Sequence, residues 1–311
     1  MTQTYNTTEI ALRGEDYSTL IEQFMKSQDI KQSSRDNYRH TIKYYLDWVA
    51  GTGRQLNALT RVDIIAYKDS LIAAGKSNLT IASYLVSVRR FYDWAEAEGL
   101  YPNIARTIKT PRKVQAFKKE HLTNDESKAL LAYYTGKSLR DYAIVNLILR
   151  TGLRTIEVVR ANVGDIKFKA GRRVLYVLGK GHDAKDSFVI LSDKAYEPIA
   201  AYLATRKGAK EEEPLFVSTA NRNNGERLTT RTISGLCKEG LKAIGRGGRE
   251  YTAHSLRHTA AVALVKTGGT LAEVQRMLRH ASPVTTKIYL ESAEEDMYLQ
   301  NAPELRLDMA F

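Results

Sequence analysis

Apolar residues recur at helical spacing through the first hundred positions of the chain. Two faces are clear, and they predict amphipathic helices near residues 38–49 and 81–95. The first face comprises Tyr38, Ile42, Tyr45, Leu46 and Val49, and the second comprises Ile81, Tyr84, Leu85, Val88, Phe91, Tyr92 and Ala95. Together with the stretches "YSTLIEQFMKS" and "IIAYKDSLIAAG", the pattern predicts about four helices in one small bundle.

Polar residues and glycines predict where these helices begin and end. The expected starts are Ser33 or Ser34 as an N-cap, Thr60 with Asp63 as a capping box, and Thr80 as a further N-cap. Gly51 and Gly99 are expected to end two of the helices, because glycine tolerates the left-handed backbone that follows many helix ends.

The pattern changes near residue 170, where helical spacing is interrupted by short β-rich runs. "RRVLYVL" and "SFVIL" are joined by "GKGHDAKD", which is typical of a hairpin, and "PLFVS" is predicted as a third strand. Helical stretches surround this region, among them "LRDYAIVNLILRTG" up to Gly152, and "SKALLAYY" after a capping box at Thr123 and Glu126. The predicted fold class is therefore mainly α with a small antiparallel β-sheet.

Composition adds an asymmetry of charge. The net charge is +12, and residues 111–311 carry +10 of it. An excess of this size favours a polyanionic partner, with phosphates as the first candidate. The single Cys237 excludes an intramolecular disulfide and fits a reducing cytosol. No apolar run reaches the roughly 18 residues of a membrane span, and the first residues lack the pattern of a secretory signal.

A basic segment separates the two parts of the chain. "RTIKTPRKVQAFKK", residues 106–119, holds six basic residues, no acidic residue and one proline, without helical or strand periodicity. It is predicted to be a linker, either a solvated loop or a strap that lies along a phosphate backbone. Motifs for nucleotide-phosphate loops and zinc sites are missing from the sequence, so neither a cofactor nor a metal is expected.

Several basic residues have neighbours that suggest a site. Arg154 opens a helix directly after Gly152 in "TGLRTIEVV", although a surface arginine is the simpler interpretation. His254 and Arg257 share a face at the start of an apolar helix, which places them at the rim of a core, although a capped histidine is the simpler alternative. His280 ends another helix. His258 is interpreted as structural.

Tyr289 follows His280 by nine residues in "RHASPVTTKIYLES". It lies directly after a short polar run, so we expect its hydroxyl to be held out of the core. Two Arg, two His, a hairpin Lys and this Tyr suit phosphoryl transfer. Guanidiniums bind the non-bridging oxygens and stabilise the charge that builds on them. A tyrosine oxygen is a competent nucleophile, and a lysine can protonate the leaving oxygen.

The order "TGLR…E", "GKG", H-x-x-R, "LRH" and then Tyr resembles the tyrosine recombinase and integrase family over the whole chain. The likeness is greatest to Xer-type and mobile-element site-specific recombinases. It implies a two-domain DNA clamp, formed by a helical core-binding (SAM-like) domain and a catalytic domain. It also implies site-specific recombination, as integration, excision or resolution, through a 3′-phosphotyrosine and a Holliday junction, without ATP or metal.

The resemblance also implies roles for individual residues. The implied catalytic set is Arg154, Lys180, His254, Arg257, His280 and Tyr289. Glu157 matches the acidic residue that the family places three positions after the first arginine. Lys180 fits the G-K-G position, but the hairpin is about two residues longer than usual, so Lys185 remains an alternative. Arg279 stands where the family usually has glycine, and we expect it either to clash or to add a DNA contact.

The expected organisation has four parts. Residues 1–13 form an extension too short for the arm-binding domain of some phage integrases, 14–105 the core-binding domain, 106–119 the linker and 120–311 the catalytic domain. The last part ends in a segment expected to dock on a neighbouring protomer. The resemblance implies double-stranded DNA with inverted-repeat core sites as partner, a homotetramer on DNA assembled from monomers or dimers, and a place on the nucleoid in the cytoplasm.

Two other functions stay open from sequence. A relaxing enzyme of the type IB topoisomerase kind would use similar chemistry but reseal the same strand. A catalytically inactive DNA-binding protein would keep the fold without the reaction, although the complete residue set argues against it.

Overall fold

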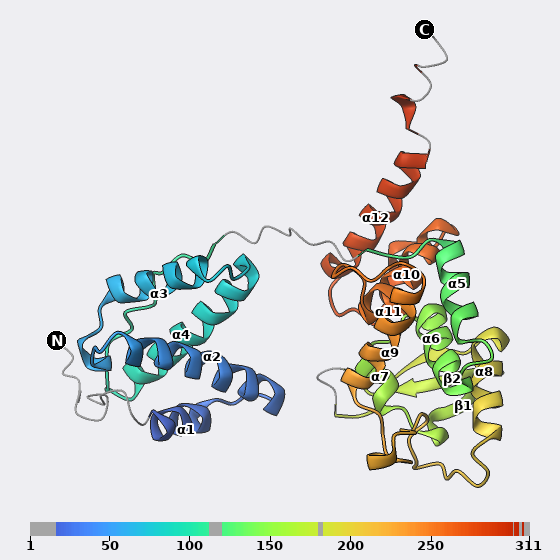
Figure 1. Cartoon of the computed structure of the whole chain (residues 1–311), viewed down its shortest axis with the longest axis horizontal. Helices are drawn as coiled ribbons and strands as arrows, with labels where there is room; N and C mark the ends of the chain where they lie inside the picture. The colour runs from blue at the N-terminus through green and yellow to red at the C-terminus, as the bar shows by residue number, and fades with distance from the viewer. Residues whose placement is uncertain (1–16, 112–119, 180–182, 301, 305–306, 308–311) are drawn as a thin grey trace. The chain divides into compact units, whose positions relative to one another are not determined.

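The computed structural model describes residues 17–111, 120–179, 183–300, 302–304 and 307. The chain divides into two compact units, Met1–Ala116 and Phe117–Phe311 (Figure 1). Each unit has a hydrophobic core of its own. The expected extension and residues 112–119 of the expected linker lie outside the described residues.

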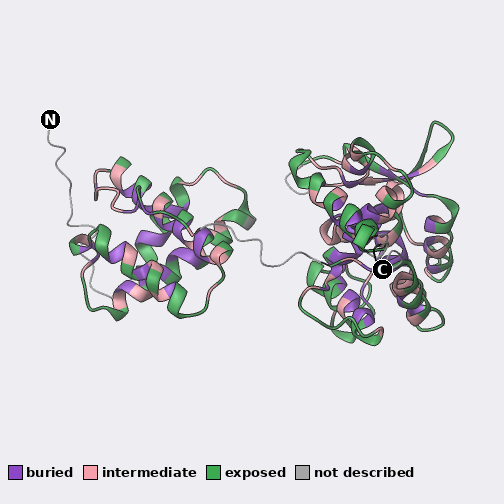
Figure 2. Cartoon of the chain, turned by 90° about the horizontal axis from the view of Figure 1, so that it is seen from above, coloured by how far each residue is buried: buried purple, intermediate pink, exposed green. Residues whose placement is uncertain are grey.

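The N-terminal unit is the predicted bundle of helices. Its elements are α1 (Ser18–Ser27), α2 (Gln32–Gly51), a 3₁₀ turn (Leu56–Ala58), α3 (Arg61–Ala73) and α4 (Asn78–Ala97). The apolar faces predicted for α2 and α4 are buried, except that Tyr38 and Tyr84 are only partly covered (Figure 2). The hydroxyls of Tyr45 and Tyr92 lie 2.8 Å apart inside this core, so two buried polar groups satisfy each other.

Two of the predicted helix starts are wrong by a few residues. The capping box of Thr60 and Asp63 forms as predicted. However, α2 begins at Gln32, ahead of the predicted serine caps, and α4 is capped by Ser77 rather than by Thr80. The Ser77 Oγ accepts a hydrogen bond from the Thr80 backbone N–H at 3.2 Å. Both hydroxyl residues belong to the cap, and the backbone conformation decides which one accepts.

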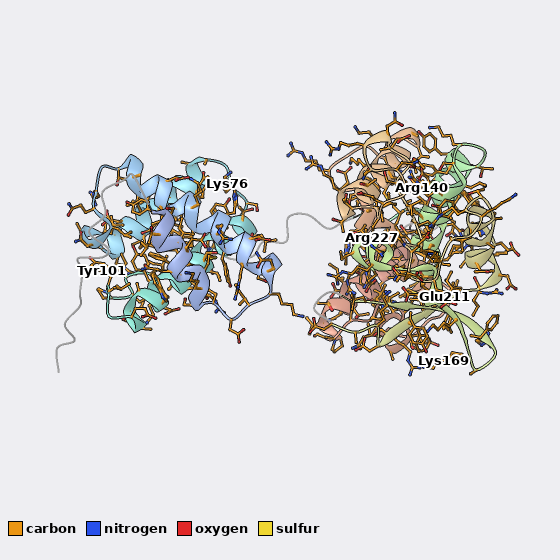
Figure 3. The ribbon with its side chains drawn as sticks, turned by 90° about the horizontal axis from the view of Figure 1, so that it is seen from below. Lys76, Tyr101, Arg140, Lys169, Glu211 and Arg227 are labelled. Atoms are coloured by element: carbon orange, nitrogen blue, oxygen red, sulfur yellow. The ribbon has the colours of Figure 1, made fainter. Side chains whose placement is uncertain are left out.

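The core of the N-terminal unit continues past α4. The Tyr101 hydroxyl donates to the Leu59 carbonyl at 2.8 Å (Tyr101 is labelled in Figure 3). Arg89 Nη2 donates to the carbonyl of Ile108 at 2.9 Å, and the Ile108 side chain is buried in the same core. The first residues of the expected linker, up to Ile108, are therefore part of the N-terminal fold.

The helices of the C-terminal unit pack around a central helix, Leu139–Thr151, most of whose residues are buried. Its helices are α5 (Asn124–Tyr134), α6 (Leu139–Thr151), α7 (Thr155–Arg160), α8 (Asp193–Ala204), α9 (Thr230–Ala243), α10 (Ala253–Lys266), α11 (Leu271–Leu278) and α12 (Val284–Gln300), with 3₁₀ turns at Val163–Asp165 and Asn221–Asn223. Helix α6 packs against α5, α8 and α10. No helix in the described ranges is long and apolar enough to cross a membrane.

A three-stranded antiparallel sheet joins these helices in the order β1 (Ile166–Lys169), β2 (Arg172–Val177), β3 (Ser187–Ile190). The predicted hairpin of β2 and β3 is confirmed, with Val174 opposite Ile190 and Val177 opposite Ser187. The prediction of a third strand at "PLFVS" is wrong. That segment makes isolated bridges and buries Leu215 in the core, while the third strand is the exposed, lysine-containing β1.

Gly152 ends α6 and brings the segments of the site together. Its φ of 62° lies in the left-handed region, as the prediction of a helix end at this glycine requires. A Cβ atom here would come within 2.8 Å of Leu278 Cδ2. The glycine therefore lets the end of α11 lie against the end of α6, two residues before Arg154.

Candidate active site

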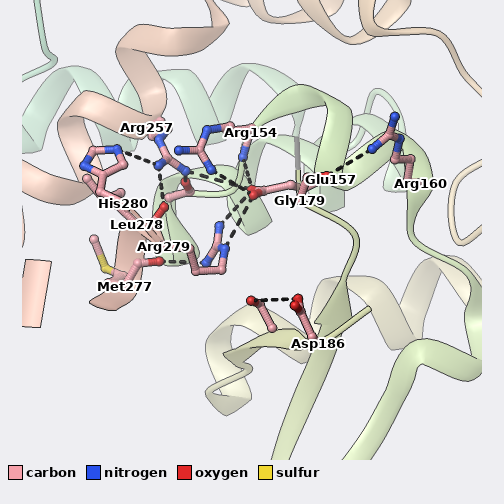
Figure 4. Close-up of polar contacts among 12 residues, drawn as sticks. Arg154, Glu157, Arg160, Gly179, Asp186, Arg257, Met277, Leu278, Arg279 and His280 are labelled. Atoms are coloured by element: carbon pink, nitrogen blue, oxygen red, sulfur yellow. Dashed lines mark hydrogen bonds and ion pairs between the residues drawn. The ribbon is translucent and has the colours of Figure 1, made fainter. Parts of the chain in front are cut away.

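Glu157 is the buried centre of the candidate site. Its carboxylate accepts from the Arg154 backbone N–H at 2.7 Å, from Arg154 Nη1 at 3.0 Å and from Arg279 Nη2 at 2.8 Å (Figure 4). Arg257 Nη1 lies 3.9 Å from the same carboxylate. Burial would raise the pKa of Glu157, but the arginines outweigh that effect, so the pKa is lowered. One buried negative charge thus holds three guanidiniums close together.

Both the backbone and the side chain of Arg154 are held by Glu157. Arg154 is the N-cap of α7, and its backbone N–H donates to the Glu157 carboxylate. Its guanidinium donates to the other oxygen of the same carboxylate. The side chain keeps 29% of its surface exposed. Arg154 can therefore present guanidinium hydrogens to a ligand while the Glu157 carboxylate fixes its direction.

Arg257 lies deeper than the sequence predicts. Its side chain is 1% exposed, so the expectation of a residue at the rim of the core is wrong. The guanidinium donates to the Gly152 carbonyl, and through Nη2 to the Leu278 carbonyl at 2.6 Å, which satisfies the ends of α6 and α11. Burial and the nearby Arg154 lower the pKa of Arg257 to about 10, so it remains charged at neutral pH.

His254 lies one turn before Arg257 on α10 and is exposed. Its backbone N–H donates to the Thr252 hydroxyl, the N-cap of the helix, at 3.3 Å. Arg154, His254 and Arg257 line one cleft of about 290 Å³, together with residues that include Ser234 of α9. Three of the predicted site residues are therefore brought to one opening from segments about 100 positions apart.

His280 is held as a neutral imidazole. Its Nε2 lies 3.0 Å from Arg257 Nη2, which is always a donor, so Nε2 accepts. The Nδ1–H then donates to the buried Thr286 hydroxyl at 2.9 Å. Burial and the positive charge of Arg257 lower the pKa of His280 to about 4, in agreement with this tautomer.

Tyr289 is buried, which contradicts the expectation that it is held out of the core. Only 5% of its surface is exposed, and it packs in a cluster with Ala261, Val274 and Leu278. Its ring stacks on His280 at 5.8 Å between centroids and meets the edge of His258 at 4.8 Å. The tyrosine therefore packs against His280, which bonds Arg257, but it is not among the residues that line the cleft.

Arg279 neither clashes nor points to solvent. Its side chain is 12% exposed and turns inward to Glu157, and its Nη1 donates to the Met277 carbonyl at 2.7 Å (Figure 4). The expectation of a clash is therefore wrong, whereas the expected DNA contact stays a prediction. The buried carboxylate offers the guanidinium a partner, which the sequence pattern alone does not reveal.

Comparison with known proteins identifies the setting of this site. Residues 120–296 match the phage integrase family, and residues 20–99 match the phage integrase N-terminal SAM-like domain. The first match alone covers more than half of the chain. The chain belongs to the phage integrase family. The recombinase is therefore an enzyme of site-specific DNA recombination, as the order of its motifs predicts.

Individual relatives support this assignment. The recombinase is 34% identical to the tyrosine recombinase XerC of Caldanaerobacter subterraneus subsp. tengcongensis, over 73% of this chain and 63% of that protein. It is 31% identical to the tyrosine recombinase XerA of Thermococcus kodakarensis, over 92% of this chain and 94% of that protein. A solved XerH site-specific recombinase, bound to palindromic difH substrate after cleavage, shares the fold. Its TM-score is 0.74 at 19% identity, over 93% of this chain and 84% of that one. The topoisomerase and inactive-protein alternatives find no support among these relatives.

Of the two candidate lysines of the recombinase, only Lys185 lies within the described residues. Lys180 lies outside the described residues. The carbonyl of its neighbour, Gly179, accepts from Arg160 Nη1 at 3.1 Å, three residues beyond Glu157 (Figure 4). Lys185 instead forms an ion pair with Asp165, next to the start of β1.

The last helix of the recombinase is held by its own domain at Asp296. This carboxylate contacts His121 Nε2 at 2.6 Å and Lys266 Nζ at 2.5 Å. Burial would raise the pKa of Asp296, but hydrogen bonds from these two residues lower it. Beyond this point the side chains of Met297 and Leu299 are 42% and 66% exposed, so α12 ends with an uncovered apolar surface.

Sequence reasoning missed two residues of the site. Thr286 and Tyr289 lie three residues apart on the buried face of α12, a spacing that could have identified the threonine. His258, interpreted as structural, is buried and packs against Tyr289, in agreement with that interpretation. Ser234 lines the cleft from α9, and no local pattern marks it.

Proposed function

We propose that the recombinase cleaves DNA at Tyr289, with the scissile phosphate bound in the cleft lined by Arg154, His254 and Arg257. The observation that supports this assignment is the meeting of these three cationic or polar groups at one opening, with His280 bonded to Arg257. Guanidiniums and an imidazole are suited to the non-bridging oxygens of a phosphodiester, whose negative charge grows during the reaction.

The proposed reaction is a pair of transesterifications. The Tyr289 oxygen attacks phosphorus, the bond from phosphorus to the 5′ oxygen breaks, and a 3′-phosphotyrosine forms. The Tyr289 hydroxyl proton passes to solvent, because both ring nitrogens of His280 are already hydrogen-bonded. We assign to Lys180 the donation of a proton to the leaving 5′ oxygen. The 5′ hydroxyl of a partner strand then attacks the phosphotyrosine, so the phosphodiester is restored without an external energy source.

The buried position of Tyr289 adds a requirement to this mechanism. The side chain is 5% exposed and does not line the cleft. Its oxygen must therefore move toward the phosphate when DNA binds. The segment that would carry this movement joins α11 to α12 and is attached to the arginine cluster through His280, which bonds both Arg257 and Thr286.

We further propose that the two units clamp double-stranded DNA at inverted-repeat core sites on the nucleoid. The net charge of +12 supports binding to a polyanion. Four copies would assemble on two sites from free monomers or dimers, and exchange strands through a Holliday junction in integration, excision or resolution. The exposed apolar end of α12, which includes Met297 and Leu299, supports docking of this segment on a neighbouring protomer.

The test of this proposal replaces Tyr289 with Phe. The substitution keeps the buried ring and removes only the oxygen, so we expect folding and single-site binding to persist while covalent attachment disappears. Adduct formation on a nicked suicide substrate, separated on a denaturing gel, measures the result. Tyr298→Phe is the matched control, because this tyrosine lies on the same helix and is 50% exposed. An adduct formed at the normal rate by Tyr289→Phe would refute the assignment.

A further inference from the structure

Arg279 adopts a backbone conformation that disfavours its side chain. It is the C-cap of α11, with φ 52° and ψ 50°. Among the described residues other than glycine, only Arg279 and Ala170 have a positive φ. Glycine is the usual residue at such a helix end, because it lacks the Cβ that crowds the left-handed conformation. A residue that keeps a long side chain here must gain something in return.

The gain comes from Glu157. The Arg279 guanidinium approaches the carboxylate with Nη2 at 2.8 Å from Oε2 and Nε at 3.5 Å from Oε1, while Nη1 donates to the Met277 carbonyl. The Glu157 side chain is fully buried and that of Arg279 nearly so. A charge-assisted contact shielded from water is stronger than the same contact on a surface, which offsets the unfavourable backbone.

Removal of Arg279 would leave Glu157 short of positive charge. The Oε1 atom would retain Arg154 Nη1, and Oε2 would retain one backbone N–H. The next guanidinium is that of Arg257, whose Nη1 is 3.9 Å from Oε2. A shift of Arg257 toward the carboxylate would pull its other nitrogen from the Leu278 carbonyl and from His280. The ion pair of Arg279 with Glu157 thus prevents a shift of Arg257 toward this carboxylate.

We propose that Arg279 is a positioning residue of this recombinase. It neutralises the buried Glu157 and so keeps Arg257 and His280 aligned for the phosphate. The inference rests on the proposed function, since it assumes that Arg257 binds the scissile phosphate. Arg279 itself does not line the phosphate cleft. Its effect is therefore expected on the rate of cleavage and not on the affinity for DNA.

The experiment removes Arg279 in a form that the backbone tolerates. Arg279→Gly relieves the left-handed strain, and Arg279→Asn is the second variant, because asparagine also tolerates this conformation. Arg279→Lys keeps a positive charge. Arg276→Ala is the matched control, an exposed arginine one turn earlier in α11. Each is measured for single-site DNA affinity, thermal unfolding and the single-turnover rate of adduct formation on a suicide substrate.

We expect Arg279→Gly and Arg279→Asn to slow adduct formation about 10- to 100-fold, the equivalent of one charge-assisted hydrogen bond, with affinity changed less than about threefold. Arg279→Lys should restore part of the rate, and Arg276→Ala should match the wild type. In a Glu157→Gln background no carboxylate remains to draw Arg257 away, so the further loss on removing Arg279 should be below about threefold.

Three outcomes would overturn the proposal. The first is a normal rate in both Arg279→Gly and Arg279→Asn. The second is an equal loss with and without Glu157→Gln, which would mean that the two residues act independently. The third is a loss of affinity as large as the loss of rate, which would make Arg279 a DNA contact. A Tyr289→Phe sample run alongside tests the nucleophile separately, because the Arg279 variants are scored on whatever adduct the intact protein forms.

Discussion

Replacing Arg257 with Ala should destabilise the C-terminal unit as well as stop the reaction. The substitution leaves the carbonyls of Gly152 and Leu278 without their donor, and a buried unsatisfied carbonyl costs about 1–3 kcal/mol. The emptied space adds a cavity term, while removal of a desolvated charge offsets part of the loss. We therefore expect the free energy of unfolding of this unit to fall by about 3–5 kcal/mol.

His254→Ala is the matched comparison, one turn away on the same helix. His254 is exposed, so its loss should change the free energy of unfolding by no more than about 0.5 kcal/mol. It lines the same cleft, so the rate of adduct formation should still fall about 100-fold or more. We therefore expect Arg257→Ala to lower both the stability and the rate of adduct formation, and His254→Ala to lower only the rate.

Urea unfolding of the full chain can assign the loss to one unit. The chain has two tryptophans, and both, Trp48 and Trp94, lie in the N-terminal unit. Tryptophan fluorescence therefore reports that unit, whereas far-ultraviolet circular dichroism reports both. Arg257→Ala should lower the midpoint seen by circular dichroism and leave the tryptophan midpoint unchanged. A destabilisation below about 1 kcal/mol would refute the view that Arg257 ties α6 to α11.

Further predictions concern the lysine, the histidine and the tail. Lys180→Ala should slow cleavage strongly and be rescued by a 5′-bridging phosphorothiolate, whose sulfur leaves without a proton; rescue confined to Lys185→Ala would reverse the assignment. The pKa of His280 is lowered to about 4 in the folded protein, so between pH 6.5 and pH 4 the unfolded chain binds a proton that the folded chain does not. As the pH is lowered through this window, the free energy of unfolding should therefore fall by on the order of 1–2 kcal/mol, allowing for the partial exposure of His280. A His280→Gln variant, measured by circular dichroism, should lack this pH-dependent loss. Deletion from residue 297 onward, which removes the exposed Met297 and Leu299, should leave single-site binding intact but reduce synaptic complexes on native gels, and unchanged complexes would exclude a role for this segment in assembly.

The sequence by itself determined most of the helices and the family. Helical periodicity, the capping box at Thr60 and the helix end at Gly152 are local properties, so they can be found without knowledge of distant contacts. The order of Arg, His and Tyr motifs identified the family in the same way. The start of α4 was misplaced because two neighbouring hydroxyl residues, Ser77 and Thr80, are both suited to the capping position. The start of α2 was misplaced because its N-cap is Lys31, which makes no side-chain capping bond and so leaves no capping signal in the sequence.

Only the tertiary structure decided how these residues meet. The third strand is β1 and not "PLFVS", because an edge strand is defined by its pairing partner and not by its own hydrophobicity. Arg257 is buried because the ends of α6 and α11, 105 and 21 residues away, offer it carbonyls. Tyr289 is packed between two histidines, and Arg279 turns inward to a carboxylate 122 positions earlier. The positions of Arg257 and Arg279 depend on polar or charged groups contributed from far along the chain, and such partners leave no mark in the local sequence.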